Sequence, residues 1–128
     1  MPVVYVFELP ATTDKKVLLD RFQEFRSRLS SGDPVGVKRA CAQLHRDSYK
    51  SESNILYVGS KRKAIKDRIK QHLGYGPTGT YAMHLTFWFP SDIKLKLHIV
   101  EMVNEDILTE VEAALSAKLK PLVGKVEK

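Results

Sequence analysis

The sequence has a single cysteine, Cys41, among its 128 residues. An intrachain disulfide and a cysteine-based zinc site both need more than one cysteine, so both are excluded. Cys41 lies within Val37 to Leu44, a pattern typical of a helix in which a small buried residue is expected. No recognisable Cys-His arrangement surrounds it, so we expect a core residue and not a nucleophile.

Long apolar runs are also missing. The longest, from Ala82 to Pro90, is interrupted by His84 and Thr86 and falls far short of the ~20 residues that a membrane-spanning helix needs. The first residues lack the basic start of a signal peptide and meet Glu8 too early. We therefore expect no membrane partner and a cytoplasmic location. The length and the 43% apolar composition predict one globular domain over residues 1–128.

Local patterns predict a mixed α/β (α+β) fold. Segments rich in β-branched and aromatic residues, or alternating in polarity, predict strands at residues 3–9, 55–58 and 94–101. Apolar residues at helical spacing, with capping residues before them, predict helices from Asp14 to about Ser30, about Pro34 to Arg46, about Lys61 to Leu73 and Asn104 to about Lys120. The segment from Thr80 to Phe89 fits both types, and we favour a helix.

Positive charge is concentrated in one short segment. Between Lys61 and Lys70 there are six Lys or Arg residues and one Asp, so this segment carries +5 of the chain's formal +6. We expect Gly59-Ser60 to make a tight exit from the preceding strand into a basic helix. Such a helix favours a partner that carries phosphate. The residues expected to contact it are Lys61, Arg62, Lys63, Lys66 and Lys70.

Three side chains near this segment suit phosphodiester hydrolysis. Tyr57 lies on the preceding strand, while Arg68 and His72 are four residues apart and so share one face of the helix. That face flanks a ridge expected to be buried, made of Ile65, Ile69 and Leu73. A guanidinium group meets the charge that develops on phosphoryl oxygens, and hydrolysis also needs a group that removes a proton from water.

A metal ligand is available on the last predicted helix. Glu110 and Glu112 both lie there, and at ~100° per residue Glu112 falls nearer the edge of the apolar face. Glu112 is thus the better candidate for a half-buried ligand. One carboxylate with several waters is a common way to hold Mg²⁺ beside a phosphate, so the lack of an acidic cluster does not exclude metal catalysis.

Together these residues resemble the GIY-YIG nuclease superfamily. The second half of its motif is similar to Tyr57-Val58-Gly59, followed by a helix with an aliphatic residue three positions before Arg68. His72, one turn beyond the arginine, resembles the branch that contains restriction-type enzymes. The family's glutamate nine residues before a proline is matched by Glu112 and Pro121.

The first half of the motif departs from the family pattern. The available strand is Val3-Val4-Tyr5, with valine where the family has glycine, although the tyrosine is present. About 50 residues separate Tyr5 from Leu56, where the family usually has a short hairpin connection. Gly124 stands where many members have an asparagine. The resemblance covers residues 3–7 and 55–125.

The resemblance implies a central three-stranded antiparallel sheet flanked by helices, with a helical insertion at about residues 11–53 between strands 1 and 2. It implies a Mg²⁺- or Mn²⁺-dependent endonuclease that hydrolyses phosphodiester bonds of DNA. Glu112 would hold the metal, Arg68 would stabilise developing charge, and Tyr5 would activate or position water with help from Tyr57 and His72. Restriction-type cleavage of both strands would suit a homodimer.

Two other readings remain open. The altered first half of the motif and the insertion fit a nucleic-acid-binding module of the same fold that has lost turnover. A third reading is a protein-interaction domain whose basic helix contacts an acidic partner. The joint presence of five candidate catalytic residues favours the nuclease, since a retired site has no need of the full set: Tyr5, Tyr57, Arg68, His72 and Glu112.

Overall fold

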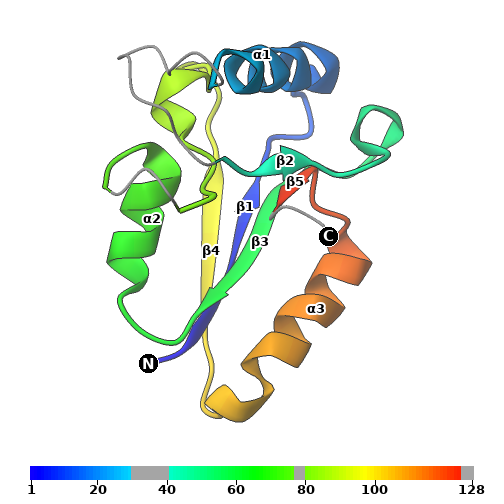
Figure 1. Cartoon of the computed structure of the whole chain (residues 1–128). Coiled ribbons are helices and arrows are strands. Elements are labelled where there is room, and N and C mark those ends of the chain that lie inside the picture. The colour runs from blue at the N-terminus through cyan, green and yellow to red at the C-terminus, as the bar shows by residue number, and fades with distance from the viewer. Residues whose placement is uncertain (30–40, 77–79, 125–128) are drawn as a thin grey trace.

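The structure of the protein is a computed structural model that describes residues 1–29, 41–76 and 80–124. In this part of the chain a three-stranded antiparallel sheet and three α-helices form a small mixed α/β fold, as expected (Figure 1). The sheet order is β3-β1-β4, from the strands Ile55–Lys61, Val3–Glu8 and Lys96–Glu101. The helices are α1 (Lys15–Arg28), α2 (Ile65–Leu73) and α3 (Leu108–Leu119). No helix within the described ranges is long and apolar enough to cross a membrane.

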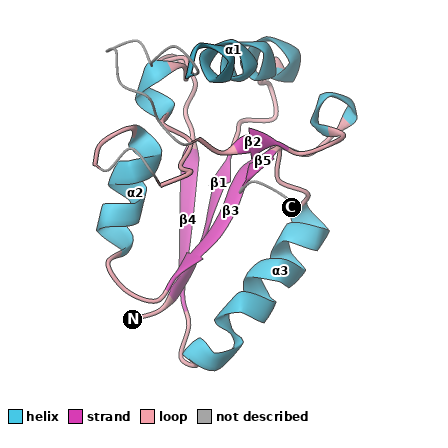
Figure 2. Cartoon of the chain, in the orientation of Figure 1, coloured by secondary structure: helices cyan, strands magenta, loops and turns pink. Residues whose placement is uncertain are grey.

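The central strand β1 is covered on both faces. Its odd-numbered residues Val3, Tyr5 and Phe7 belong to the main hydrophobic core, and the rings of Tyr5 and Phe7 contact His72 of α2. Helix α3 packs against β3 and β1. Figure 2 shows α2 and α3 on opposite sides of the sheet. Burial on both faces explains why β1 reads as a continuous apolar run and not as an alternating one.

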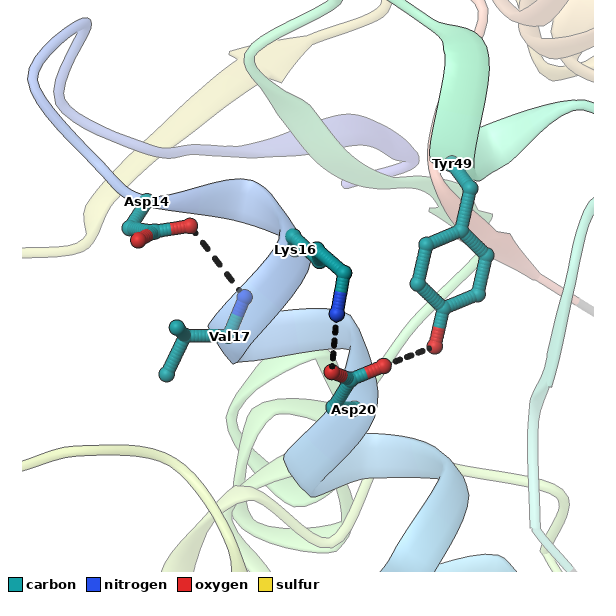
Figure 3. Close-up of polar contacts among 5 residues, drawn as sticks. All are labelled: Asp14, Lys16, Val17, Asp20 and Tyr49. Carbon is teal, nitrogen blue, oxygen red and sulfur yellow. Dashed lines mark hydrogen bonds and ion pairs between the residues drawn. The ribbon is translucent and has the colours of Figure 1, made fainter.

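Helix α1 begins where its capping residue predicts. The Asp14 carboxylate accepts a hydrogen bond from the Val17 N–H, 3.2 Å away, and so satisfies a free donor at the helix start (Figure 3). Asp20 on the same helix pairs with Lys16 and accepts from the Tyr49 hydroxyl at 2.7 Å. Tyr49 belongs to a short 3₁₀ helix, η2 (Ser48–Lys50), so this bond ties η2 to α1.

The helix predicted from Pro34 to Arg46 is wrong over residues 41–46, and its earlier part lies outside the described residues. Gln43–Leu44 form strand β2 instead, antiparallel to β5 (Val123–Gly124). The Ala42 N–H donates to the Ala82 carbonyl at 3.0 Å. Main-chain pairing with distant segments therefore overrides the local helical pattern. Cys41 is buried as expected, at 6% exposure, and burial raises the pKa of its thiol to about 12.

Strand β3 is longer than predicted, so the expected turn at Gly59-Ser60 is wrong. Gly59, Ser60 and Lys61 continue the strand, each opposite a residue of β1. Helix α2 therefore begins at Ile65 instead of Lys61. Lys61, Arg62 and Lys63 consequently precede the helix. Pairing with the full length of β1 explains the extension, because it satisfies main-chain groups that a turn would leave to water.

The segment from Thr80 to Phe89 contains no α-helix, contrary to our expectation. Only Leu85–Phe87 form one 3₁₀ turn, η3. Tyr81 and His84 have positive φ angles of 51° and 53°, which break a right-handed helix. The Trp88 indole N–H donates to the Met83 carbonyl at 2.8 Å and folds the segment onto itself.

The predicted strand at 94–101 is present as β4, but it is not half-buried. All six of its residues are exposed, because β4 lies at the sheet edge and α3 packs on the two other strands. The last helix matches the prediction closely. Asn104 caps a 3₁₀ turn, η4 (Glu105–Ile107), that leads directly into α3.

Candidate active site

Tyr5 and Gly59 lie directly opposite each other on paired strands. The phenol of Tyr5 crosses over Gly59 so closely that a Cβ atom there would lie 2.5 Å from Cζ and Oη of the tyrosine. Any larger residue at this position would displace the ring, which is almost fully buried. The position of the Tyr5 ring therefore depends on a glycine at residue 59.

His72 holds the Tyr5 hydroxyl in place. Its Nε2 atom lies 2.9 Å from Tyr5 Oη, and its Nδ1 atom accepts a hydrogen bond from the Met83 N–H at 3.2 Å. Since Nδ1 is the acceptor, neutral His72 carries its proton on Nε2 and donates it to Tyr5. Burial, together with the charge of Arg68, lowers the pKa of His72 to about 2. Neither nitrogen is open to remove a proton from water.

The burial of His72 also changes the expected face of α2. His72 is 0% exposed whereas Leu73 is 38% exposed, so the histidine takes the buried position that we assigned to the leucine. Ile65 and Ile69 are partly buried against the core, as expected. The rings of Tyr5, Phe7 and Tyr57 surround the imidazole. A histidine fits at this buried position because its ring packs against three aromatic rings.

Arg68 joins the two tyrosines. Its Nε atom donates to Tyr5 Oη and its Nη2 atom to Tyr57 Oη, both at 3.4 Å. Nη1 donates to Gln71 Oε1 at 2.9 Å and to the Thr80 carbonyl at 3.1 Å. These four bonds use four of the five N–H groups of a guanidinium, which leaves one for a ligand. Burial lowers the pKa of Arg68, but the two phenols outweigh it and the net shift is upward, so the charge is kept.

The two tyrosines stack and stay protonated. Their ring centroids are 6.1 Å apart with planes 12° from parallel. Burial raises the pKa of Tyr5 and of Tyr57 above the ordinary value of ~10, and Arg68 only partly opposes this. Glu112 also raises the pKa of both phenols, so its charge reaches them.

Glu112 is attached to this group through Ser60. The Ser60 hydroxyl donates to Glu112 Oε1. Gly59 and Ser60 are consecutive on β3 and point to opposite faces, so one lies under Tyr5 and the other contacts α3. The carboxylate therefore turns toward the end of β3 and is half-buried, as expected for Glu112.

The two partners of the Ser60–Glu112 hydrogen bond line two different hollows. A hollow of about 400 Å³ is lined by Tyr5, Arg68 and Lys61, together with Gly59, Ser60, Gln71 and Thr80. The lining of a larger groove, of about 1090 Å³, includes Glu112 and Val58. Ser60 belongs to the smaller hollow and binds the glutamate of the larger one.

The predicted phosphate contacts are distributed over three segments. Lys61 lines the smaller hollow at the end of β3, Arg62 and Lys63 are exposed in the loop after it, and Lys66 and Lys70 are exposed on α2. The expectation of one basic helix is therefore corrected. One of these cationic residues, Lys61, lines the hollow, and the other four are exposed outside it.

Sequence reasoning missed three groups that shape the site. Ser60 binds Glu112, Gln71 binds Arg68, and the Met83 N–H sets the tautomer of His72. Ser60 was accessible to prediction, since extending the strand alternation from Leu56 places it on the face opposite Gly59. The contribution of Met83 depends on a long-range fold of the chain, and no local pattern indicates it.

The donor set fits a single-carboxylate Mg²⁺ site. The described ranges contain no group of three or more His, Cys, Asp or Glu side chains that would hold a metal. Mg²⁺ often binds through one or two carboxylates, with waters and substrate phosphate completing its shell, and Glu112 has that position at the edge of open space. Comparisons of this chain with protein-family models, with curated proteins and with solved structures found no match.

Proposed function

We propose that this protein is a Mg²⁺-dependent endonuclease that hydrolyses phosphodiester bonds of DNA, of the GIY-YIG type. The observation that carries the proposal is the convergence on the Tyr5 hydroxyl. His72 and Arg68, from α2, both bond to it, and Gly59, from β3, lies beneath it. The spacing of Arg68 and His72 places them on one helix face, but nothing in local sequence requires either of them to meet Tyr5, which lies 63 and 67 residues away along the chain.

The side chains divide the chemistry of phosphodiester hydrolysis among them. Arg68 presents one free N–H and its charge to the smaller hollow, where a phosphoryl oxygen gains negative charge during attack. Tyr5 positions the attacking water by donating a hydrogen bond to it, since His72 and Arg68 occupy the phenol oxygen as donors. The raised pKa of Tyr5 keeps the phenol proton in place in the absence of substrate. The water would lose its own proton to solvent, helped by the charge of an ion held at Glu112. His72 is a positioning residue that acts through Tyr5.

Glu112 is the residue that would hold Mg²⁺, with Ser60 orienting the carboxylate. When bound there, the ion supplies charge stabilisation to the phosphate and acidifies water. Lys61, Arg62, Lys63, Lys66 and Lys70 contact backbone phosphates, which position the polymer without reading its sequence. A homodimer would bring two such sites to the two strands of a duplex.

The test is cleavage of supercoiled, branched and single-stranded DNA in Mg²⁺ or Mn²⁺. Wild-type protein is expected to cut at least one substrate, and Glu112→Gln to lose about 100-fold or more of the rate. Glu110→Gln is the matched control, because Glu110 is an exposed residue two positions away on the same helix. It is expected to cut like wild type.

Two other results would replace the proposal. DNA binding without cleavage of any substrate would favour the binding module, a reading supported by the raised pKa of Tyr5 and the lack of an open base on His72. Binding that is absent or independent of salt would favour an acidic protein partner, since phosphate contacts make affinity fall steeply with salt.

A further inference from the structure

The larger groove runs beside the second half of α3. Its walls are the end of that helix, from Glu112 to Lys120, and the loop that carries η2. Val58, Val123 and Gly124 also line it. At about 1090 Å³ the groove lies at the upper end of the ~300–1,000 Å³ range typical of small-molecule sites. Its size is sufficient for a segment of polymer.

The charge and the chemistry of the groove match a nucleic-acid backbone. Four exposed cationic residues line it, and apart from Glu112 it has only two carboxylates, Asp47 and Glu52. Within the described ranges none of the four side chains has a hydrogen bond or ion pair that would neutralise it. The four are Arg46, Lys50, Lys118 and Lys120.

The groove has few groups suited to stacking on bases. None of its described lining residues is Phe, Tyr or Trp, so His45 is the one aromatic ring among them on which a base could stack. Two of its serine hydroxyls are committed to main-chain carbonyls, Ser48 to Leu122 and Ser53 to Leu119. Its four exposed cations, against three carboxylates, remain available to contact phosphates without regard to sequence.

The position of Glu112 connects this groove to the candidate active site. Glu112 lines the groove, and its partner Ser60 lines the hollow that contains Tyr5 and Arg68. We infer that the groove holds the DNA backbone on one side of the scissile phosphate, independently of sequence. The exposed cations Arg62, Lys63 and Lys66 hold the backbone on the other side. This inference rests on the proposed nuclease function.

Salt-dependent binding tests the groove. The measurement uses fluorescent DNA of two unrelated sequences and protein carrying Glu112→Gln to prevent cleavage. Adding Lys50→Gln and Lys118→Gln is expected to weaken binding of both sequences about 10-fold and to reduce the salt slope by about 1.4–1.8. The matched control adds Lys94→Gln and Lys96→Gln, which remove the same charge from exposed positions outside both hollows.

The outcomes separate this inference from the proposed function. If Lys61→Gln with Arg62→Gln weakens binding while the groove variant binds like the control, the groove inference is wrong and the nuclease proposal stands. A loss that differs between the two sequences also overturns it. If the parent protein binds no DNA, both fail. Circular dichroism of the groove variant should match the parent, because the substituted lysines are exposed.

Cross-linking provides a second, independent readout. Cys41 is buried and its thiol pKa is raised to about 12, so Ser116→Cys introduces the one reactive thiol among the described residues. DNA with a haloacetyl group on successive backbone positions is expected to react with it on one side of the cleaved bond only. Val103→Cys, at a residue 99% exposed and outside the groove, is the control. Reaction on both sides, or none above this control, would contradict the inference.

Discussion

The hydroxyl of Tyr5 accepts a hydrogen bond from Nε2 of His72, 2.9 Å away in the buried interior. Because the Met83 N–H occupies Nδ1, the direction of this bond is set by the main chain and not by pH. The histidine therefore orients a phenol. A free catalytic base would need an open nitrogen, and His72 has none.

If His72 works only through Tyr5, their substitutions are not additive. We expect Tyr5→Phe to lower the single-turnover cleavage rate about 100-fold and His72→Phe to lower it about 10-fold, with the double variant no slower than Tyr5→Phe alone. His98→Phe is the control, since His98 lies exposed on β4. An equal effect of His72→Phe in both backgrounds would mean that it acts independently of Tyr5.

Folding stability should fall on the acid side because His72 is buried as a neutral group. Its folded pKa is about 2 and the unfolded value is ~6.5, so the unfolded state binds the extra proton between these values. The contribution of His72 to the free energy of unfolding is complete above pH ~6.5 and is lost toward pH 2. Over this range the free energy of unfolding falls by up to about 1.4 kcal/mol per pH unit. When the free energy of unfolding is measured with urea at several pH values in this range, it should change less steeply with pH for His72→Phe than for wild type. An equal dependence on pH would refute the assignment.

Stability should also fall in alkali. The pKa values of Tyr5 and Tyr57 are raised by burial, so the unfolded chain ionises its phenols first, from about pH 10. The stabilisation is complete below that pH and disappears as the pH rises through the folded values. Tyr5→Phe should reduce the loss of unfolding free energy above about pH 10, measured by urea unfolding. An alkaline loss of stability that is unchanged by Tyr5→Phe would show that the fold does not protect the Tyr5 phenol.

Ser60 should set metal affinity more than turnover. Ser60→Ala removes the hydroxyl that orients Glu112, and loss of such a partner costs about 10–100-fold in metal affinity. We expect the Mg²⁺ concentration for half-maximal cleavage to rise by that factor, with a near-normal rate at saturation. Thr109→Ala, an exposed position on α3, serves as the control. A lower saturating rate with unchanged Mg²⁺ dependence would place Ser60 in the chemical step instead.

Local sequence determined several elements of this protein because their signals come from neighbouring residues. The apolar residues of β1, the Asp14 cap of α1 and the Asn104 cap before α3 each specify an element at short range. Spacing alone also distinguished Glu112 from Glu110, since position around a helix follows from a constant angle per residue.

Tertiary structure decided what depends on partners far along the chain. Gln43–Leu44 form a strand because Val123–Gly124 pair with them, and Gly59-Ser60 continue a strand because β1 extends beside them. The tautomer of His72 depends on the Met83 N–H, and the exposure of β4 depends on its place at the sheet edge. The sequence thus specified which side chains are available for the candidate site. Long-range main-chain hydrogen bonds, which local patterns do not encode, determined how those groups meet.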